Sequence, residues 1–180
     1  FPDLPYAFNS GGDPADLPQL TCDTLKEFHQ TYYHPSRCLF FFYGNLPLKQ
    51  HLRAITPALN VPPVSPIPPL PRQARFTQPQ HHVAYYPIDT AESSEQRTLI
   101  AFGWLTAPLV EQEDVLALSL LDIILMESDA SPLKKALLAS KLCIQADAYI
   151  ETELSEVPYL IVCKGCLGAN ANKLETLILN

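Results

Sequence analysis

Proline constrains the folding of this chain more than any other residue. Seven of the fifteen residues from 57 to 71 are proline. Proline has no backbone N–H to donate, and its ring clashes with the preceding helical turn, so this run is excluded from helices and from the interior of a sheet. We expect residues 57–74 to form an extended, proline-rich interdomain linker.

The same run permits a second interpretation. Its Pro63-x-x-Pro66 and Pro68-x-x-Pro71 spacings are those of peptides that bind SH3 or WW domains. Arg72, however, follows Pro71 directly and is not at the offset that usually fixes the orientation of such a ligand. A stiff spacer is the favoured interpretation, and a proline-rich interaction module is the alternative.

Residues 1–56 predict a loop, a helix, a strand and a second helix. Glycine, Asx residues and proline between Asn9 and Pro14 require a sharp turn. Thr21 is placed as an N-cap for a helix over 22–33. The apolar run 38–43 predicts a short buried strand, and 47–55 predicts another helix.

Residues 75–180 predict a second module with more strands. Strands are predicted over 75–87, from the strand-like order of its apolar residues, and over 96–104, where apolar residues alternate. Two more strands are predicted over 145–154 and 157–167, around a tight connection. Between these pairs of strands, the apolar run 115–126 predicts a central buried helix. Ser131 and Pro132 predict the start of a short helix, and Asn172 with Glu175 predicts a capping pair for the last helix. The pattern indicates an α+β fold with a mixed or antiparallel sheet and helices packed on it.

A set of short motifs gives the chain a more specific resemblance. The set comprises a Gly-Gly-Asp-Pro turn, a Tyr-His-Pro-Ser step after the first helix, and a Tyr-Gly-Asn step after the apolar run. The residues that carry it are Gly11, Gly12, Asp13, Pro14, Tyr33, His34, Pro35, Tyr43 and Gly44. In order and spacing they resemble the presequence-protease branch of the pitrilysin and insulin-degrading type of zinc metallopeptidase, the inverzincins. The resemblance extends more loosely over the second half of the chain.

The resemblance implies an internal fragment of a larger enzyme. Members of the family degrade short unstructured peptides in an enclosed chamber, and only their first domain carries zinc. The chain would then hold the C-terminal part of that domain in 1–56 and the N-terminal part of a second, non-catalytic homologous domain in 75–180. It would form chamber wall and substrate-contacting scaffold and be inactive by itself, with the remainder of the same polypeptide as its partner.

The resemblance also singles out one strand. In insulin-degrading relatives, an exposed strand edge of the second domain pairs with the end of the peptide, so that backbone hydrogen bonds hold the ligand. The corresponding residues here are Ile144, Gln145, Ala146, Asp147, Ala148, Tyr149 and Ile150. A strand covered within the sheet is the alternative, and a catalytically dead paralogue of the same fold is the alternative for the parent protein.

Metal chemistry is not expected in this chain. The inverzincin motif His-x-x-Glu-His, which would hold zinc, is absent, and the five histidines share no comparable spacing. Cys163 and Cys166 are three apart on a predicted strand, where side chains face opposite sides unless the chain turns at Gly165. We therefore expect no catalytic or metal-binding residues, zinc only in the parent protein, and structural roles for the cysteines.

The net charge and the length of the apolar runs limit the kinds of partner that this chain is expected to bind. The formal net charge of -7 argues against nucleic acid, whose phosphates require basic patches. The longest apolar run is too short to span a bilayer, so no membrane partner is expected. A soluble protein of the bacterial cytoplasm or an organelle matrix is the expectation. The open edges of a truncated domain also predict self-association of the fragment.

Overall fold

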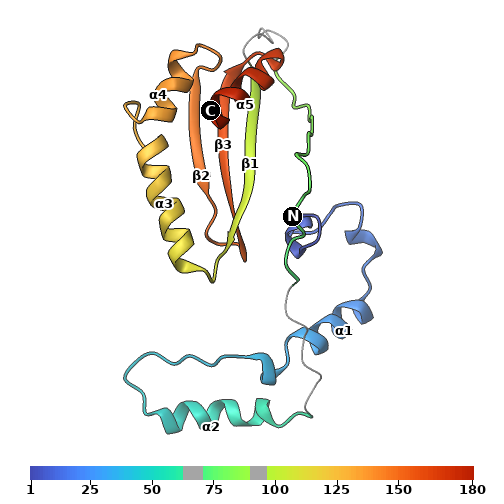
Figure 1. Cartoon of the computed structure of the whole chain (residues 1–180). Helices are drawn as coiled ribbons and strands as arrows, with labels where there is room; N and C mark the ends of the chain where they lie inside the picture. Colours follow the sequence, from blue (N-terminus) through green and yellow to red (C-terminus); the bar gives the residue numbers. More distant parts are fainter. Residues whose placement is uncertain (63–70, 90–96) are drawn as a thin grey trace. The chain divides into compact units, whose positions relative to one another are not determined.

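The computed structural model describes residues 1–62, 71–89 and 97–180. The chain divides into two compact units, Phe1–Gln73 and Ala74–Asn180. Figure 1 shows the elements of each, and each unit is described by itself. Most of the Pro-x-x-Pro region lies outside the described residues, so its conformation stays a prediction.

The first unit contains two helices joined by irregular segments. Helix α1 runs over Cys22–Tyr32 and helix α2 over Leu48–Leu59, and short 3₁₀ turns occupy Pro5–Ala7, Leu17–Gln19 and Pro35–Arg37. The predicted cap is confirmed, because the Thr24 backbone N–H donates to Thr21 Oγ1 at 3.1 Å. Such a bond satisfies one of the amides that a helix start leaves unpaired.

Helix α2 continues past the position at which the sequence predicts its end. It includes Pro57, which lies in its last turn. A proline there removes a single backbone bond rather than breaking a central turn. The Thr56 hydroxyl also donates to the Leu52 carbonyl at 2.6 Å, within the helix. The exclusion of helix from the start of the proline run was therefore wrong.

The predicted strand 38–43 does not form. These residues are irregular, and Leu39 and Phe41 are 95% and 84% exposed. A strand is stabilised by cross-strand bonds and side-chain pairs, and no other strand of the described residues lies in this unit. The apolar composition of residues 38–43 predicts a strand, but the described part of this unit contains no second strand with which they could pair.

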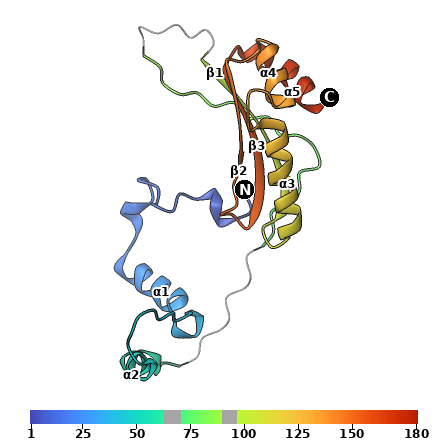
Figure 2. The ribbon, with the colours of Figure 1, turned by 90° about the vertical axis from the view of Figure 1, so that its left-hand side faces the viewer.

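The second unit is a three-stranded antiparallel sheet with helices on one face. Strands β1 (Thr98–Pro108), β3 (Glu156–Cys166) and β2 (Gln145–Ile150) are arranged in the order β1-β3-β2. Helices α3 (Gln112–Met126), α4 (Pro132–Ala139) and α5 (Ala171–Leu179) cover the same face, as Figure 2 shows. The predicted α+β class is confirmed, and every strand pairing in the described residues is antiparallel.

The core of this unit lies between the sheet and the helices. Its fully enclosed centre includes Leu137, Ile161 and Leu174, and the half-buried Ile100 and Phe102 pack against it. Burying a side chain of this size stabilises the folded state by about 1.5–3 kcal/mol. The core therefore joins all three strands to the helices through a small number of apolar side chains.

Two further expectations for this unit were wrong. Residues 75–87 form no strand, although 98–108 do. Helix α3 buries only Val115 and Met126, while residues such as Leu116, Leu120 and Ile124 are more than half exposed. A helix rich in leucine on every side thus contacts the sheet along one stripe and is not central.

The capping predictions need correction in detail. Ser131 is the N-cap residue of α4, but its hydroxyl accepts from the Ser128 N–H and caps no amide of the helix. Helix α5 begins at Ala171, so Asn172 lies inside it and forms no capping pair with Glu175.

Candidate peptide-binding edge and signature loop

Strand β2 lies at one edge of the sheet. It pairs with β3 on one side, in the register Gln145↔Lys164 to Ile150↔Tyr159, and with no strand of the described residues on the other. Six of the seven residues predicted for the substrate-contacting strand are in β2, while Ile144 precedes it. The geometry that β-augmentation requires is therefore present.

The hydrogen-bond pattern shows which backbone groups face the open edge. The Glu151 N–H donates to the Pro158 carbonyl at 3.3 Å. Because residues of an antiparallel pair alternate between bonded and non-bonded positions, the odd-numbered residues of β2 bond to β3. Ala146, Ala148 and Ile150 consequently direct their N–H and C=O groups away from β3, toward the open edge.

The odd-numbered side chains form a polar group on the uncovered face of the sheet. Lys164 Nζ lies 3.2 Å from Asp147 Oδ2, and Gln145 Nε2 donates to the same oxygen at 2.6 Å. The hydrogen bond to Asp147 raises the pKa of Lys164, and Tyr149 acts in the same direction. Sequence analysis missed Lys164, because only the strand register brings it opposite Gln145.

A close contact fixes the start of β2. Gly165 has a φ of +70°, and a Cβ added there would lie 2.6 Å from Ile144 Cδ1. The Ile144 side chain therefore packs directly over the Gly165 backbone. The backbone N–H of Ile144 donates to the Lys164 carbonyl at 2.9 Å. Only glycine combines this backbone angle with this approach.

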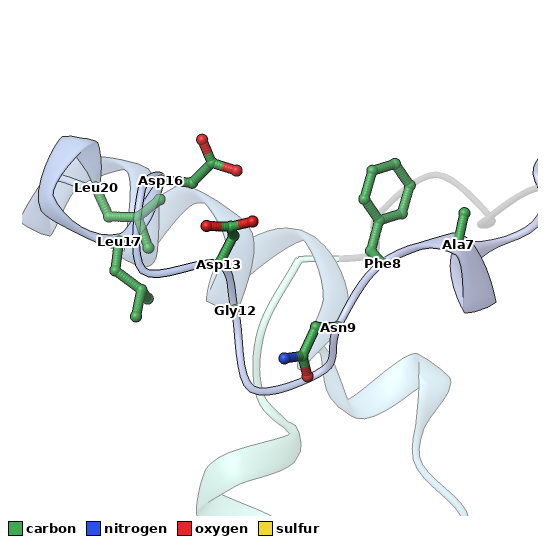
Figure 3. A pocket seen from close by; sticks show the side chains of 8 residues that line it. All are labelled: Ala7, Phe8, Asn9, Gly12, Asp13, Asp16, Leu17 and Leu20. Atoms are coloured by element: carbon green, nitrogen blue, oxygen red, sulfur yellow. The ribbon is translucent and has the colours of Figure 1, made fainter. Parts of the chain in front are cut away.

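The Gly-Gly-Asp-Pro motif forms a compact loop beside a shallow pocket of about 300 Å³. Figure 3 shows its lining, which includes Phe8, Asp13, Asp16 and Leu17. The Asp13 carboxylate accepts from the Ala15 N–H at 2.8 Å, and the Gly12 N–H donates to the Asn9 carbonyl at 2.9 Å.

These hydrogen bonds stabilise the turn. Gly12 has a φ of +84°, and a Cβ there would lie 2.9 Å from a Leu17 methyl. The motif residues thus owe their identity to the geometry of the turn.

The other signature residues serve local structure as well. Tyr33 ends α1 and stacks on His29, with ring centroids 5.1 Å apart. His34 Nδ1 accepts from the Ser36 N–H, so Nε2 carries the proton and donates to the Pro62 carbonyl at 2.7 Å. Pro35 starts a 3₁₀ turn, and Tyr43 is 93% exposed beside Gly44, whose φ is +132°.

The structure brings three cysteines together in the core. Cys143, Cys163 and Cys166 are buried, while Cys22 and Cys38 are exposed. Cys163 and Cys166 share the core because the chain turns at Gly165 and the β1–β3 register shifts between Thr98 and Ile100. Cys163 and Cys166, three residues apart, therefore lie on the same side because the strand is interrupted at Gly165, as the sequence analysis allowed.

Burial keeps these core thiols protonated. It raises the pKa of Cys163 to about 12 and that of Cys166 to about 11, and it also raises the pKa of Cys143. The thiolate is the form that acts as nucleophile or metal ligand. The arrangement therefore favours packing over chemistry at neutral pH.

The histidines are dispersed through the first unit and the start of the second. Besides His29 and His34, His51 stacks on Phe42 with centroids 4.6 Å apart. Within residues 1–62, 71–89 and 97–180, no group of three or more potential ligands is arranged to hold a metal ion. The described residues thus do not fit a zinc site.

None of the helices in the described residues combines the length and the apolar character that crossing a membrane requires.

One protein family and several known proteins match this chain over most of its length. Residues 19–180 match the family described as "Peptidase M16 inactive domain". The chain is 35% identical over 147 residues to a mitochondrial presequence protease of Xenopus laevis, covering 78% of this chain and 14% of that protein. It is 34% identical over 185 residues to presequence protease 1, chloroplastic/mitochondrial, of Arabidopsis thaliana, covering 99% and 17%.

A bacterial relative also matches almost the whole of this chain. Protein HypA of Clostridium perfringens is 28% identical over 177 residues, which is 97% of this chain and 18% of that protein. The chain thus spans less than a fifth of the length of these curated relatives. With the family match over most of its residues and the α+β sheet described above, this chain belongs to the M16 peptidase family, in its presequence-protease branch.

Proposed function

We propose that this chain is the scaffold part of a zinc metalloendopeptidase that degrades short unstructured peptides in an enclosed chamber. Its family membership supports a peptidase parent. Since the described residues hold no metal-ligand cluster, the zinc and the hydrolytic step belong to other parts of that parent. This chain contributes chamber wall and peptide contacts.

The proposed domain organisation follows from the same membership. Residues 1–56 close the metal-carrying domain, 57–74 link the domains, and 75–180 begin the non-catalytic domain. The division of the chain at Gln73 and Ala74 supports a boundary at the end of the linker. The relatives named as mitochondrial or chloroplastic support an organelle matrix as the compartment. A bacterial cytoplasm is the alternative, because one relative comes from a bacterium.

The peptide contact is proposed for the open edge of β2. The observation that carries it is the outward direction of the backbone groups of Ala146, Ala148 and Ile150. An extended peptide that adds to this edge forms backbone hydrogen bonds whatever its side chains are, which suits an enzyme for many unrelated peptides. Each such bond contributes about 0.5–1.5 kcal/mol net.

Ala148→Pro in the complete enzyme tests the proposal. Proline removes an N–H that faces the open edge and no bond to β3, so the sheet tolerates it. We expect KM to rise about two- to tenfold for several unrelated peptides while kcat changes little, in line with the loss of one hydrogen bond. Ala148→Ser is the matched control, because it keeps the amide and should leave KM unchanged.

The outcomes separate binding from folding. Unchanged KM for Ala148→Pro across these peptides would contradict a contact at this edge. Tyr149→Pro removes an N–H that bonds to β3, so it should lower stability where Ala148→Pro does not.

The sequence that precedes this stretch in the parent gene tests the activity. A His-x-x-Glu-His motif followed by a distant glutamate identifies an active peptidase, because these residues hold zinc and activate its water. Their absence identifies a catalytically silent paralogue that uses the same scaffold.

A further inference from the structure

Negative charge is concentrated at the end of the sheet where β1 ends and β3 begins, the lower end in Figure 1. Residues 105–116 and 150–158 include no basic residue but six acidic ones, Glu111, Glu113, Asp114, Glu151, Glu153 and Glu156. All of these except Glu156 are exposed to solvent. Glu113 and Asp114 also lie in the first turn of α3, where acidic side chains stabilise the helix dipole. The residue that requires a further explanation is therefore Glu156.

Glu156 is buried, and one of its oxygens lacks a hydrogen bond. The residue is 3% exposed at the start of β3. Its Oε2 atom accepts no hydrogen bond from the described residues and lies 3.6 Å from Arg75 Nη2. Hydrogen bonds between ionised groups are about 2.7–2.9 Å long, so this contact is an ion pair without a hydrogen bond. A buried carboxylate is costly unless it is paired, so Glu156 favours a positive charge at this place.

Two carbonyl groups beside Glu156 accept from the same guanidinium. Arg75 Nη1 donates to the Leu105 carbonyl at 2.6 Å, and Nη2 donates to the Thr106 carbonyl at 2.7 Å. The β1–β3 register shifts between Leu105 and Pro108, and such an irregularity leaves backbone groups outside the ladder. We call the carbonyl oxygens of Leu105 and Thr106 with Oε2 of Glu156 the acceptor site.

The acceptor site is held in place by β1 and β3 themselves. Leu105 pairs with Pro158 in the antiparallel register. The Thr106 hydroxyl donates to the Val157 carbonyl at 2.6 Å. Because these contacts join the two strands without involving Arg75, the acceptors keep their arrangement when Arg75 leaves.

The acceptor site favours a guanidinium group over an ammonium group. A guanidinium is planar and carries five N–H donors in a fixed fork, whereas an ammonium is a compact point charge. Two neighbouring carbonyls, each bound by a different nitrogen, match that fork. Arg75 fills the fork but leaves Oε2 of Glu156 without a hydrogen bond, and half of the Arg75 side chain is exposed. The site is thus open to solvent and incompletely satisfied by its present occupant.

We propose that the acceptor site binds an arginine side chain of a basic peptide, and that Arg75 occupies it in the free chain as a self-ligand. A peptide arginine displaces Arg75 and forms the hydrogen bond to Glu156 that Arg75 does not form. The acidic residues at this end of the sheet attract a basic peptide. That the peptide is a substrate of the parent enzyme rests on the proposed function; the acceptor site does not.

An NMR titration of the complete 180-residue chain with N-acetylarginine amide tests the site, with the backbone amides of Thr106 and Val157 as reporters. A competitor tethered in the same chain lowers the apparent affinity, so the probe should bind Arg75→Gln at least about tenfold more tightly than the unaltered chain. N-acetyllysine amide should bind Arg75→Gln more weakly than the arginine probe, because it lacks the fork. Adding Glu156→Gln to Arg75→Gln should abolish binding of the arginine probe.

Two matched controls change the same residue types without altering the acceptor site. Arg72→Gln should bind the probe as the unaltered chain does, and Glu153→Gln added to Arg75→Gln should keep the tighter binding. Equal affinity for the arginine and lysine probes, tighter binding that survives Glu156→Gln, or no binding in any variant would overturn the proposal. Unchanged affinity in Arg75→Gln would overturn the role of Arg75 as self-ligand.

A second variant keeps the test decisive if Arg75→Gln does not fold, since that change leaves Glu156 buried without a charged partner. Arg75→Lys keeps a positive charge beside Glu156 but loses the fork, so it should also bind the arginine probe more tightly than the unaltered chain. Its urea unfolding midpoint, monitored by Trp104 fluorescence, should rise with the arginine probe and not with the lysine probe. The same midpoint with both probes would contradict the proposal.

The acceptor site and the proposed peptide contact at β2 can fail separately. Ala148→Pro lies on the edge strand β2, outside the acceptor site, so it should leave the titration with N-acetylarginine amide unchanged. Unaltered KM in that variant would contradict the contact at β2 and leave the acceptor site standing. Loss of the arginine preference in the titration would contradict the acceptor site and leave the contact at β2 standing.

Discussion

The two units of this chain bury their apolar residues very differently. In Phe1–Gln73, Leu4 is the one apolar residue of the described part that is fully buried, and Phe8, Leu25 and Phe41 are more than half exposed. In Ala74–Asn180, a continuous core connects the three strands to the helices. The family signature is densest in the unit that has almost no core of its own.

The number of family motifs in a unit and the presence of an apolar core in that unit are therefore separate properties. Turns and helix caps need only neighbouring residues, so they form in the first unit without a core. A sheet needs strands that are distant in sequence, and β1 and β3 supply them in the second unit. Its exposed apolar side chains make the first unit the expected source of any self-association of the chain.

The largest expected effect comes from emptying the core of the second unit. Leu137 is fully buried on α4, and Leu137→Ala should reduce the free energy of unfolding by about 2–5 kcal/mol, because it removes contacts and leaves a cavity. Urea unfolding monitored by the fluorescence of Trp104, the single tryptophan of the chain, measures it.

The counterpart in the first unit is Leu25→Ala. Leu25 is 67% exposed on α1, so the same change should alter the Trp104 transition by less than about 0.5 kcal/mol. A comparable loss in both variants would mean that the first unit is packed as well as the second, and would remove the contrast.

The cysteines predict an intermediate effect that also distinguishes the units. The pKa of Cys163 is raised from 9.0 to about 12 and that of Cys166 to about 11, chiefly by burial. The folded state therefore holds these protons more tightly than the unfolded state does. The stability that this contributes is fully present below pH 9 and is lost as the pH rises through 11 to 12.

Two measurements check this. The urea midpoint of the Trp104 transition should fall between pH 9 and pH 11, and the fall should be smaller for Cys163→Ala, which removes one of the titrating groups. At pH 8, a thiol reagent should modify Cys22 and Cys38 rapidly and the three core cysteines only after unfolding. Rapid modification of all five would contradict a closed core.

The sequence predicts local structure better than it predicts pairing. Thr21 was identified as a cap because its partner, Thr24, is three residues away. Strands β2 and β3 were identified because apolar alternation coincides with a tight connection between them. Residues 38–43 are all apolar, and residues 75–87 include Phe76, Val83 and Tyr85, but no local signal reports whether another strand lies beside either segment.

The candidate site shows the same limit. The strand that became β2 was named from resemblance, and all but Ile144 of its residues fall in it. The Lys164 partner of Asp147 and the Arg75 contact with Glu156 depend on register and on a bulge, which residue types do not encode. The turn at Gly165 was recognised only as an exception that a glycine permits.

The smallest effect on the second unit should come from Thr21→Ala. It removes the side-chain oxygen that accepts from the Thr24 N–H, a cap worth about 1 kcal/mol to the helix. Helix α1 has eleven residues and little packing, and helices this short are marginal in water, so the change should reduce its helicity measurably. Backbone chemical shifts over 22–32 measure that loss, while the Trp104 transition should not move. Thr24→Ala keeps the donating N–H and should preserve the helix. A shift of the Trp104 transition in Thr21→Ala would show that the units stabilise each other, and the contrast between them would then be one of degree.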